Sequence, residues 1–408
     1  MADQVERSDK IKYVKFGNTD MMVSEVCAGT MTWGSFNGEE TEAYEQMDRL
    51  IELGVNFFDT AELYPVGFNY GQTTELWMGN WLEKRVAEGK VDRSKLFLAS
   101  KVNALAMGGS LEGRIGVAHG YDEEIVVHSC KATIDRMKCE YLDLYQLHWP
   151  SRDIPIFGAH AFFPKGENRA FPYFDEGKPE DFERAVLSVK KLFDMKLIKH
   201  WGLSNENAYG VTMFCTTCDR LGVPRPVSLQ NDYSVLNRLY EGDVLEACYR
   251  FGIVGLPYGC LAGGTLTGKY IKDSEEFKAA NADRPAAKWR HTQCADFQTR
   301  YHFPVCLEAG KKYTALAHKY SLTPTELALA WANTRSFNAS IIIGTTTVKQ
   351  VDECVNAFKI QKLPDALIAE IQALHEEYRS PMTFFTDPEV CKKAEWKQGE
   401  KLLASACL

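Results

Sequence analysis

The sequence lacks the features that direct a chain to membranes or to nucleic acid. No apolar stretch reaches the roughly 18 consecutive residues of a membrane-spanning helix. Lysine and arginine number 47 against 55 acidic residues, which gives a formal net charge of −8, and no basic run is present. Such a charge does not favour nucleic acid or an anionic membrane as a partner. The chain starts with MADQVERSDK, which is not typical of a signal or transit peptide, so we expect a cytoplasmic protein.

The cysteine pattern gives little support to a metal or disulfide site. The chain has 12 cysteines but a single CxxC pair, Cys215 and Cys218. A metal site would need a second pair or suitably spaced histidines nearby, so we predict no metal. The pair falls midway along a predicted helix from Tyr209 to Leu221, whereas a redox pair would favour a helix N-terminus. We interpret these residues as reduced thiols, which suits a reducing compartment.

Short apolar runs alternate with amphipathic segments along the chain. The runs predict eight strands, which begin at Val23, Asn56, Leu96, Tyr141, His200, Val227, Ile253 and Ser340. Segments with a period of about 3.6 residues lie between them and predict helices, for example those that begin at Thr41, Glu123 and Asp181. Glycines follow several expected helix ends, as C-terminal caps do: Gly54, Gly222 and Gly252.

Eight strand–helix units predict an α/β fold of the closed (β/α)8 TIM-barrel type. The 408 residues, 45% of them apolar, suit one barrel enlarged by insertions. We predict a single domain over residues 1–379, which includes a last helix from Asp365 to Tyr378, and a C-terminal tail over residues 380–408. A doubly wound sheet is the alternative, but no GxGxxG follows the first predicted strand.

Three segments are longer than ordinary strand–helix loops: residues 104–121, 151–179 and 272–304. Each follows a predicted strand, so we expect all three to project from the C-terminal face of the barrel. The second segment is rich in aromatic residues, namely Phe157, Phe162, Phe163, Phe171, Tyr173 and Phe174. This composition suits a wall for an apolar substrate.

Four polar residues at or just after predicted strand ends suit carbonyl reduction: Asp59, Tyr64, Lys101 and His148. Hydride transfer to a carbonyl carbon leaves negative charge on the oxygen, and a positioned acid must neutralise it. A free tyrosine has a pKa of about 10, and a nearby ammonium such as Lys101 would lower that pKa. Asp59 could hold Lys101 in place, and His148 could orient the oxygen. Taken singly, each residue could equally be an ion pair, a packing group or a loop histidine.

The motifs DTAELY, SKV, QLHWP, GLSN, QNDY and GGTLTGK occur in this order, starting from Asp59. Over roughly residues 11–375 the chain resembles the aldo-keto reductase family, in particular its Tas-like branch near the potassium-channel β-subunits. The resemblance implies a TIM barrel that reduces carbonyl compounds with a nicotinamide cofactor. It also implies that Asp59, Tyr64, Lys101 and His148 form the catalytic tetrad.

The resemblance further implies where NADPH binds. The implied positions are Thr30, Met31, Asp59, Ser204, Asn205, Gln230, Tyr258, Gly259, Cys260, Leu261, Gly263, Leu266, Gly268, Lys269, Gly344, Thr346, Gln350 and Glu353. Among them, Ser204, Asn205 and Gln230 would bind the carboxamide, and Tyr258 would stack on the nicotinamide ring. The GGTLTGK loop would cover the pyrophosphate. Gly344 and Thr346 would meet the 2′-phosphate, and Gln350 and Glu353 the adenine.

Ordinary structural interpretations compete with these assignments. Serine and asparagine at strand ends commonly cap turns, Tyr258 could be core packing, and the segment from Ile343 could be a plain helix start. The GGTLTGK loop fits the first part of a P-loop, but Tyr270 replaces the required Ser or Thr, so nucleotide hydrolysis is not expected.

Two departures from the family pattern affect the adenosine end. Thr345 stands where many members carry a lysine, and Cys354 where an asparagine usually contacts adenine. Lys349 could supply the missing charge.

We therefore predict an NADPH-dependent reductase of small aldehydes or ketones. Its substrate walls would be Trp33, Tyr64, His148 and Trp149, with the aromatic segment beside them. A regulatory or redox-sensing subunit that binds NADPH with little turnover is the alternative. The channel branch often replaces the tetrad histidine by asparagine, so His148 favours turnover. A vestigial scaffold is less consistent with an intact tetrad, and a homo-oligomer stays open.

Overall fold

The computed structural model describes residues 5–66, 71, 73–104, 120–159, 161–162 and 175–383. Eight parallel strands form its central sheet, in the order β10-β9-β8-β7-β6-β5-β4-β11. Their bounds are β4 (Val26–Gly29), β5 (Phe57–Asp59), β6 (Phe97–Val102), β7 (Leu142–Leu147), β8 (Ile198–Ser204), β9 (Ser228–Gln230), β10 (Val254–Gly255) and β11 (Ile341–Gly344). Each coincides with one of the eight predicted apolar runs.

Backbone hydrogen bonds join the two outer strands of this sheet. The amide of Ala339 donates to the carbonyl of Gly255 at 2.9 Å, and the amide of Ile342 donates to the carbonyl of Pro257 at 2.9 Å. The sheet therefore closes on itself, which confirms the predicted (β/α)8 barrel. In a doubly wound sheet, each of the two outer strands would have one edge without a hydrogen-bonded neighbour.

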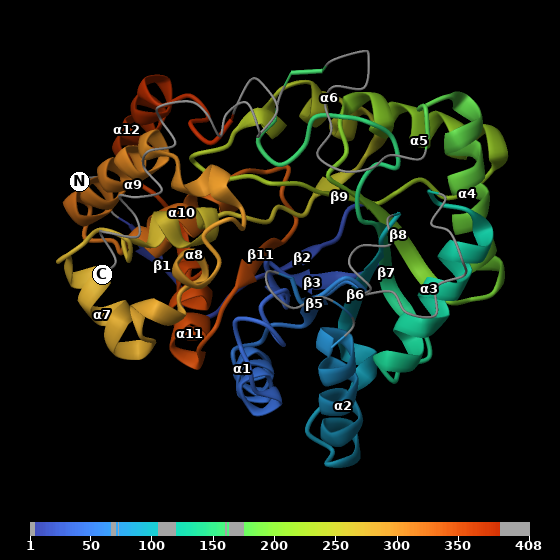
Figure 1. Cartoon of the computed structure of the whole chain (residues 1–408), viewed down its shortest axis with the longest axis horizontal. Helices are drawn as coiled ribbons and strands as arrows, with labels where there is room; N and C mark the ends of the chain where they lie inside the picture. The colour runs from blue at the N-terminus through green and yellow to red at the C-terminus, as the bar shows by residue number, and fades with distance from the viewer. Residues whose placement is uncertain are drawn as a thin grey trace.

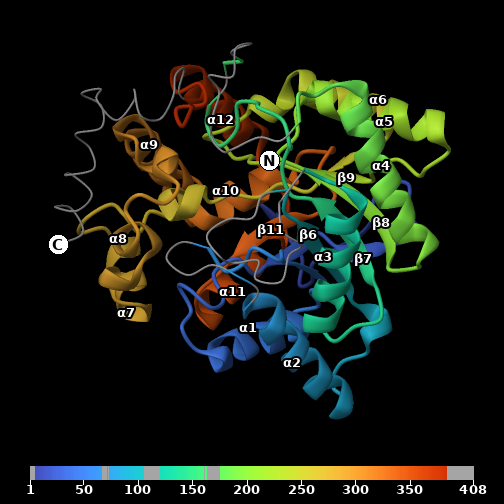
Figure 2. The ribbon, with the colours of Figure 1, turned by 45° about the vertical axis from the view of Figure 1, so that its right-hand side comes forward.

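Helices surround the barrel (Figure 1). Figure 2 shows α3 to α6 packed outside β6 to β9. The helix bounds are α1 (Glu40–Glu52), α2 (Thr73–Ala87), α3 (Glu123–Arg136), α4 (Pro179–Asp194), α5 (Ala208–Leu221), α6 (Asp243–Phe251), α7 (Glu275–Asp283), α8 (Arg290–Gln293), α9 (Pro304–Lys319), α10 (Pro324–Asn333), α11 (Val348–Ala357) and α12 (Asp365–Glu377). Among the described residues, no helix is both long and apolar enough to cross a membrane.

Two small antiparallel pairs complete the strands. One pairs β1 (Glu6–Arg7) with β12 (Ile360–Lys362), and the other pairs β2 (Tyr13–Lys15) with β3 (Met22–Ser24). Phe16 and Met21, between β2 and β3, join one buried cluster with Phe57 and Ala99 of the barrel strands. Phe58 follows Phe57 and Leu98 precedes Ala99 on the same strands, and these two residues belong to a second cluster that includes helix residues. This alternation follows the two-residue period of a strand and separates the barrel interior from its outer layer.

Local details of the helices also match the sequence. The residues after α1, α5 and α6 include Gly54, Gly222 and Gly252, each with a positive φ between 66° and 87°, as C-terminal caps require. Cys215 and Cys218 are buried within α5, and burial raises the pKa of both thiols to about 12. Both thiols therefore stay protonated at neutral pH, and neither is a reactive thiolate.

The predicted long segments are described to different extents. Segment 272–304 is described throughout and contains α7 and α8. Residues 105–119 of segment 104–121, residues 160 and 163–174 of segment 151–179, and the tail from residue 384 onward lie outside the described residues. The domain boundary at residue 379 therefore stays a prediction.

Candidate active site

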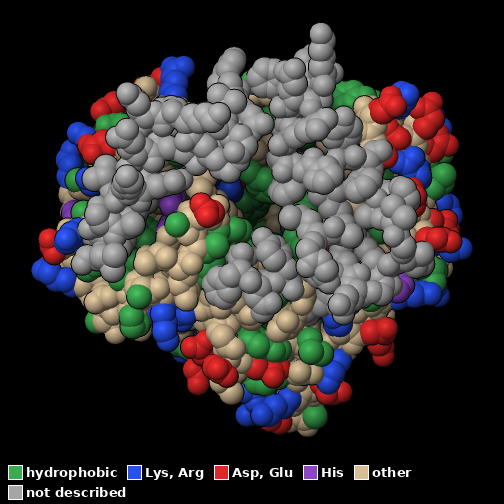
Figure 3. All heavy atoms as spheres, in the orientation of Figure 1, with side chains coloured by type: hydrophobic (Ala, Val, Ile, Leu, Met, Phe, Trp, Pro, Cys, Tyr) green, Lys and Arg blue, Asp and Glu red, His purple; other side chains and the backbone are tan. Residues whose placement is uncertain are grey.

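A cavity of about 1060 Å³ lies at the carboxyl ends of the barrel strands. Residues that end or follow seven of the eight barrel strands line it, together with much of segment 272–304. In Figure 3 a hollow near the centre of the view contains hydrophobic side chains. Segment 272–304 therefore covers the site, as its position after a strand predicted.

The structure brings the four tetrad residues together at one end of this cavity. Asp59 ends β5, Lys101 lies near the end of β6, and His148 directly follows β7. The Lys101 ammonium donates to Asp59 Oδ2 at 2.5 Å and to the Thr60 carbonyl at 2.7 Å, and its nitrogen lies 3.4 Å from the Tyr64 hydroxyl. Asp59, Tyr64 and His148 line the cavity, whereas Lys101 is fully buried behind them.

Burial and charge act in opposite directions on the Lys101–Tyr64 pair. Burial disfavours the charge on Lys101, but the Asp59 carboxylate and Tyr64 raise the pKa of Lys101 above its ordinary value. Burial raises the pKa of Tyr64 by more than the Lys101 charge lowers it. The expected net lowering of the Tyr64 pKa is therefore wrong for this structure. Tyr64 instead holds its proton at neutral pH, which is the state a proton donor needs.

His148 is a neutral imidazole in this environment. Burial, and then the charge of Lys101, lower the pKa of His148 well below its ordinary value. Its ring stacks on Trp149 with centroids 4.5 Å apart and lies 5.8 Å from the Tyr64 ring. Its Nδ1 atom is buried and has no hydrogen-bond partner among the described residues. A neutral imidazole keeps one N–H group, which can donate to a carbonyl oxygen.

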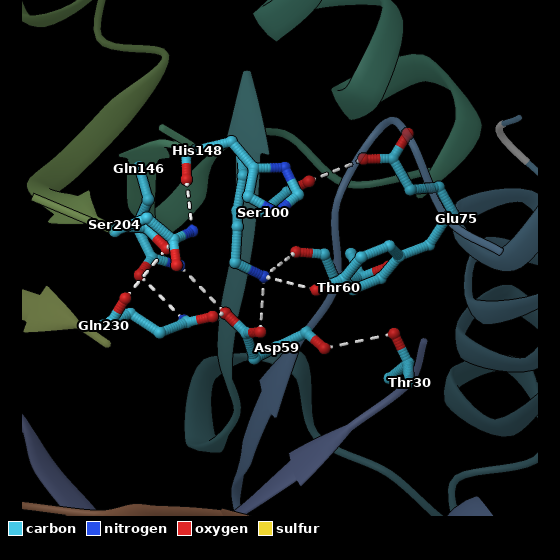
Figure 4. Close-up of polar contacts among 12 residues, drawn as sticks. Thr30, Asp59, Thr60, Glu75, Ser100, Gln146, His148, Ser204 and Gln230 are labelled. Carbon is cyan, nitrogen blue, oxygen red and sulfur yellow. Dashed lines mark hydrogen bonds and ion pairs between the residues drawn. The ribbon is translucent and has the colours of Figure 1, made fainter. Parts of the chain in front are cut away.

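Two glutamine amides hold the second oxygen of Asp59, as Figure 4 shows. Gln146 and Gln230 donate to Asp59 Oδ1 at 2.8 and 3.0 Å, and Gln230 also donates to Gln146 Oε1 at 2.9 Å. The sequence argument assigned Gln230 to the cofactor and missed Gln146. Gln146 belongs to β7 and lies two residues before His148. Side chains two residues apart point to the same face of a strand, so this alternation was the signal that places Gln146 inside the barrel.

The residues assigned to the nicotinamide are linked to His148. Asn205 has a φ of 56°, donates to the His148 carbonyl at 2.9 Å, and accepts from the Tyr258 hydroxyl at 2.6 Å. Ser204 donates through its hydroxyl to the Gln230 carbonyl at 2.9 Å. These contacts hold the ends of β7, β8 and β9 in one arrangement beside the tetrad.

The segment after β11 forms the far end of the cavity. The backbone N–H and hydroxyl of Thr346 both donate to Gln350 Oε1, at 2.9 and 3.1 Å. Lys349, Glu353 and Cys354 line the same wall. Thr345 is buried and turned away, because its hydroxyl donates to Gln46 Oε1 at 2.8 Å. Thr345 therefore cannot take the place of the family lysine, whereas Lys349 borders the cavity.

Most of the predicted binding residues line the cavity. Those that do are Thr30, Met31, Asp59, Ser204, Asn205, Gln230, Tyr258, Gly259, Cys260, Leu261, Gly263, Lys269, Gly344, Thr346, Gln350 and Glu353, with Tyr64, His148 and Trp149 at the substrate end. Three predicted residues do not line it. Leu266 is buried, Gly268 turns the chain with a φ of 76°, and Trp33 is fully buried with its indole nitrogen 3.4 Å from Gln46.

The sequence singled out Trp289, Tyr301 and Phe303 in segment 272–304, and all three line the cavity. It missed other lining residues of this segment, among them Arg290, Phe297, Gln298 and Arg300. No motif marks these four positions. The signal for them was the length of the segment and its place after a strand.

The fold and the site together define an oxidoreductase built on a (β/α)8 barrel. A model of the Aldo/keto reductase family matches residues 25–376, and the chain belongs to that family. It is therefore a NAD(P)H-dependent oxidoreductase of a family that acts on small carbonyl substrates. This confirms the resemblance drawn from the motifs.

Relatives span most of the chain. "Protein tas" of Escherichia coli (strain K12) is 32% identical over 376 residues, which cover 91% of this chain and 99% of that protein. A Babesia bovis protein named "Aldo-keto reductase" is 31% identical over 266 residues, or 63% of this chain and 88% of that protein. The "Uncharacterized oxidoreductase YrpG" of Bacillus subtilis (strain 168) is 27% identical over 350 residues, or 86% and 92%.

Proposed function

We propose that this protein reduces aldehydes or ketones with NADPH, and that Tyr64 is the proton donor. The observation that carries the proposal is the buried Lys101 ammonium, which lies between the Asp59 carboxylate and the Tyr64 hydroxyl at the cavity wall. A buried lysine is costly unless it is paired, so this arrangement is a built feature of the site.

The residues of the cavity fit a nicotinamide dinucleotide. Polar groups of Ser204 and Asn205 suit the carboxamide end beside the tetrad, and the ring of Tyr258 suits stacking on the nicotinamide. Gly263 and Lys269, with their close backbone approach and positive charge, suit a pyrophosphate. Thr346 and Lys349, at the start of α11, suit the 2′-phosphate of NADPH. When bound, the reduced cofactor would supply a hydride to the carbonyl carbon.

The chain's own residues would carry the proton chemistry. Tyr64 would give its proton to the carbonyl oxygen as negative charge develops there. Lys101 would stabilise the resulting phenolate, and Asp59 would keep Lys101 charged and in place. His148, as a neutral imidazole, would donate a hydrogen bond that orients the same oxygen.

The test is NADPH consumption by the purified protein against aldehydes, ketones and quinones, with Tyr64→Phe in parallel. We expect wild-type turnover with one or more carbonyl classes, and a loss of about 100-fold or more in the variant. NADPH affinity, measured by fluorescence titration, should be the same in both. Equal turnover in the two proteins would show that Tyr64 is not the acid. NADPH binding by wild type without turnover of any carbonyl would instead favour a redox-sensing subunit.

A further inference from the structure

Two side chains outside the cavity form a buried ion pair. Arg152 follows β7 and Glu206 follows β8, and neither lines the cavity. The guanidinium donates to both carboxylate oxygens, from Nη1 to Oε1 at 2.7 Å and from Nη2 to Oε2 at 2.8 Å, and the side chains are 8% and 3% exposed. The guanidinium carbon also lies 5.3 Å from the centre of the Phe182 ring and 5.5 Å from that of the Tyr209 ring. These contacts hold the pair in one geometry.

The surrounding backbone leaves room for this pair at two glycines. A Cβ atom at Gly210 of α5 would overlap with Glu206 Oε2 and would lie 2.7 Å from Arg152 Nη2. A Cβ atom at Gly177 would lie 2.8 Å from Arg152 Cδ. A larger residue at either position would displace the pair, because a packed interior has no spare volume. The local sequence is therefore built around the ion pair.

Glu206 directly follows Asn205, whose backbone is in the left-handed region with a φ of 56°. Residues other than glycine rarely adopt this conformation, although asparagine does so more readily than most. In this conformation the Asn205 side chain donates to the His148 carbonyl at 2.9 Å and accepts from the Tyr258 hydroxyl at 2.6 Å. The carbonyl of Glu206 accepts from the Asn231 side chain at 2.8 Å. The position of Asn205 therefore depends on how the backbone at Glu206 is held.

The ion pair connects the residues on both sides of the hydrogen bond between Asn205 and His148. Arg152 ends the segment HWPSR that begins at His148, and Glu206 comes directly after Asn205. The pair thus joins the loop after β7 to the loop after β8. A buried ion pair adds little to stability compared with apolar residues of the same volume. The fixed geometry of the pair, rather than its strength, is therefore the property that suits this place.

We propose that Arg152 and Glu206 are positioning residues, which hold Asn205 in the left-handed conformation so that its amide meets the nicotinamide end of the cofactor. This proposal rests on the reductase function proposed above. Asn205 Oδ1 accepts from Tyr258 and has a second lone pair, which can accept from the carboxamide N–H of the cofactor. The nicotinamide ring would then be held beside the tetrad.

Loss of the ion pair would affect one end of the cofactor. The loop after β8 would relax toward an ordinary backbone conformation, and the Asn205 amide would leave its place. The phosphate and adenine contacts would persist, because Lys269 and the start of α11 lie in other segments of the cavity wall. A purely structural role predicts a different result, namely a loss of stability that weakens binding at both ends alike.

The test compares NADP+ with adenosine 2′,5′-bisphosphate, which has the adenosine end of the cofactor but no nicotinamide. In calorimetric titrations, Arg152→Met should bind NADP+ roughly three- to tenfold more weakly than wild type and the bisphosphate with unchanged affinity. At saturating NADPH its kcat should fall by a similar factor, because the hydride donor is less well aligned. Arg152→Lys keeps the charge opposite Glu206 but not the two parallel hydrogen bonds, so it should bind NADP+ with intermediate affinity. If Arg152→Met does not fold, Arg152→Lys decides the test.

The matched control is Arg93→Met. Arg93 pairs with the buried Asp143 of β7 at 2.9 Å, and neither residue lines the cavity. Asp143 also pairs with Lys199 at 3.1 Å, so it keeps one counterion in this variant. Arg93→Met therefore loses an ion pair on the same strand, and it should bind both nucleotides as wild type does. Thermal unfolding shows whether each variant is folded.

A double-mutant cycle shows whether Arg152 acts through Asn205. Asn205→Gly removes the amide and still permits the left-handed conformation. In that background, Arg152→Met should cause no further loss of NADP+ affinity. A further loss as large as in wild type would overturn the proposal, as would equal weakening of NADP+ and bisphosphate binding in Arg152→Met, or no weakening of either. If both nucleotides behave as expected but no carbonyl is reduced, the reductase function fails and the positioning role stands.

Discussion

The side-chain amide of Gln146 donates to Asp59 at 2.8 Å, on the carboxylate oxygen that Lys101 does not occupy. Asp59 is thus held from both sides, by an ammonium on Oδ2 and by amides on Oδ1. A carboxylate held in this way fixes the position of Lys101, and through it the position of the Tyr64 hydroxyl.

Gln146→Leu should lower kcat about tenfold and leave NADPH affinity unchanged, because a hydrogen bond to a charged group of about 1.5–3 kcal/mol is lost. The measurement is steady-state reduction of the best aldehyde, with cofactor titration in parallel. Gln46→Leu is the matched control. Gln46 is also a buried amide, but it contacts Trp33 and Thr345 outside the cavity. A similar fall in kcat for both variants would mean that Gln146 acts only through general stability.

Lys101→Met should abolish turnover and lower the free energy of unfolding by about 3–5 kcal/mol, because Asp59 is left buried without its counterion. Urea unfolding followed by circular dichroism measures the stability change. The double variant Asp59→Asn/Lys101→Met removes both charges and should recover much of the stability, but not the turnover. A single variant as stable as wild type would contradict the buried ion pair.

The depressed pKa of His148 predicts how stability depends on pH. The folded state keeps His148 neutral, whereas in the unfolded chain it binds a proton below a pKa of about 6.5. The stability that this group contributes is therefore complete above that pH and is lost as pH falls. Between pH 7.5 and 5 the free energy of unfolding should therefore fall in both proteins, and the fall should be about 2 kcal/mol smaller in His148→Gln than in wild type. Parallel pH profiles of the unfolding free energy would refute the buried neutral imidazole, since His291 and His302 are present in both proteins.

Lys349→Met should reduce the preference for NADPH over NADH. A charged contact with the 2′-phosphate is worth about 1.5–3 kcal/mol, so the preference should fall roughly tenfold to a hundredfold. Fluorescence titration with both cofactors measures it, and NADH affinity should not change. Lys312→Met, on the exposed surface of α9, controls for the loss of a positive charge. Equal dissociation constants for NADPH and NADH in wild type would show that the start of α11 does not bind this phosphate.

The sequence alone was sufficient to predict the barrel and the proximity of Asp59, Tyr64, Lys101 and His148. The apolar runs mark the strands because a strand buried on both faces needs continuous apolar residues, and this requirement is local. Asp59, Lys101 and His148 lie at or directly beside the ends of three of those strands, and parallel strands in a barrel bring their carboxyl ends to one face. Their proximity follows from the strand order without knowledge of any side-chain contact.

Tertiary structure alone decided the properties that depend on neighbours distant in sequence. Trp33 and Thr345 follow strand ends, but both side chains contact Gln46 of α1 and do not line the cavity. The pKa of Tyr64 is raised because desolvation depends on every group packed around it, and one nearby lysine does not determine it. Arg290 reaches the cavity through a segment without a motif, so only the tertiary structure places it on the cavity wall.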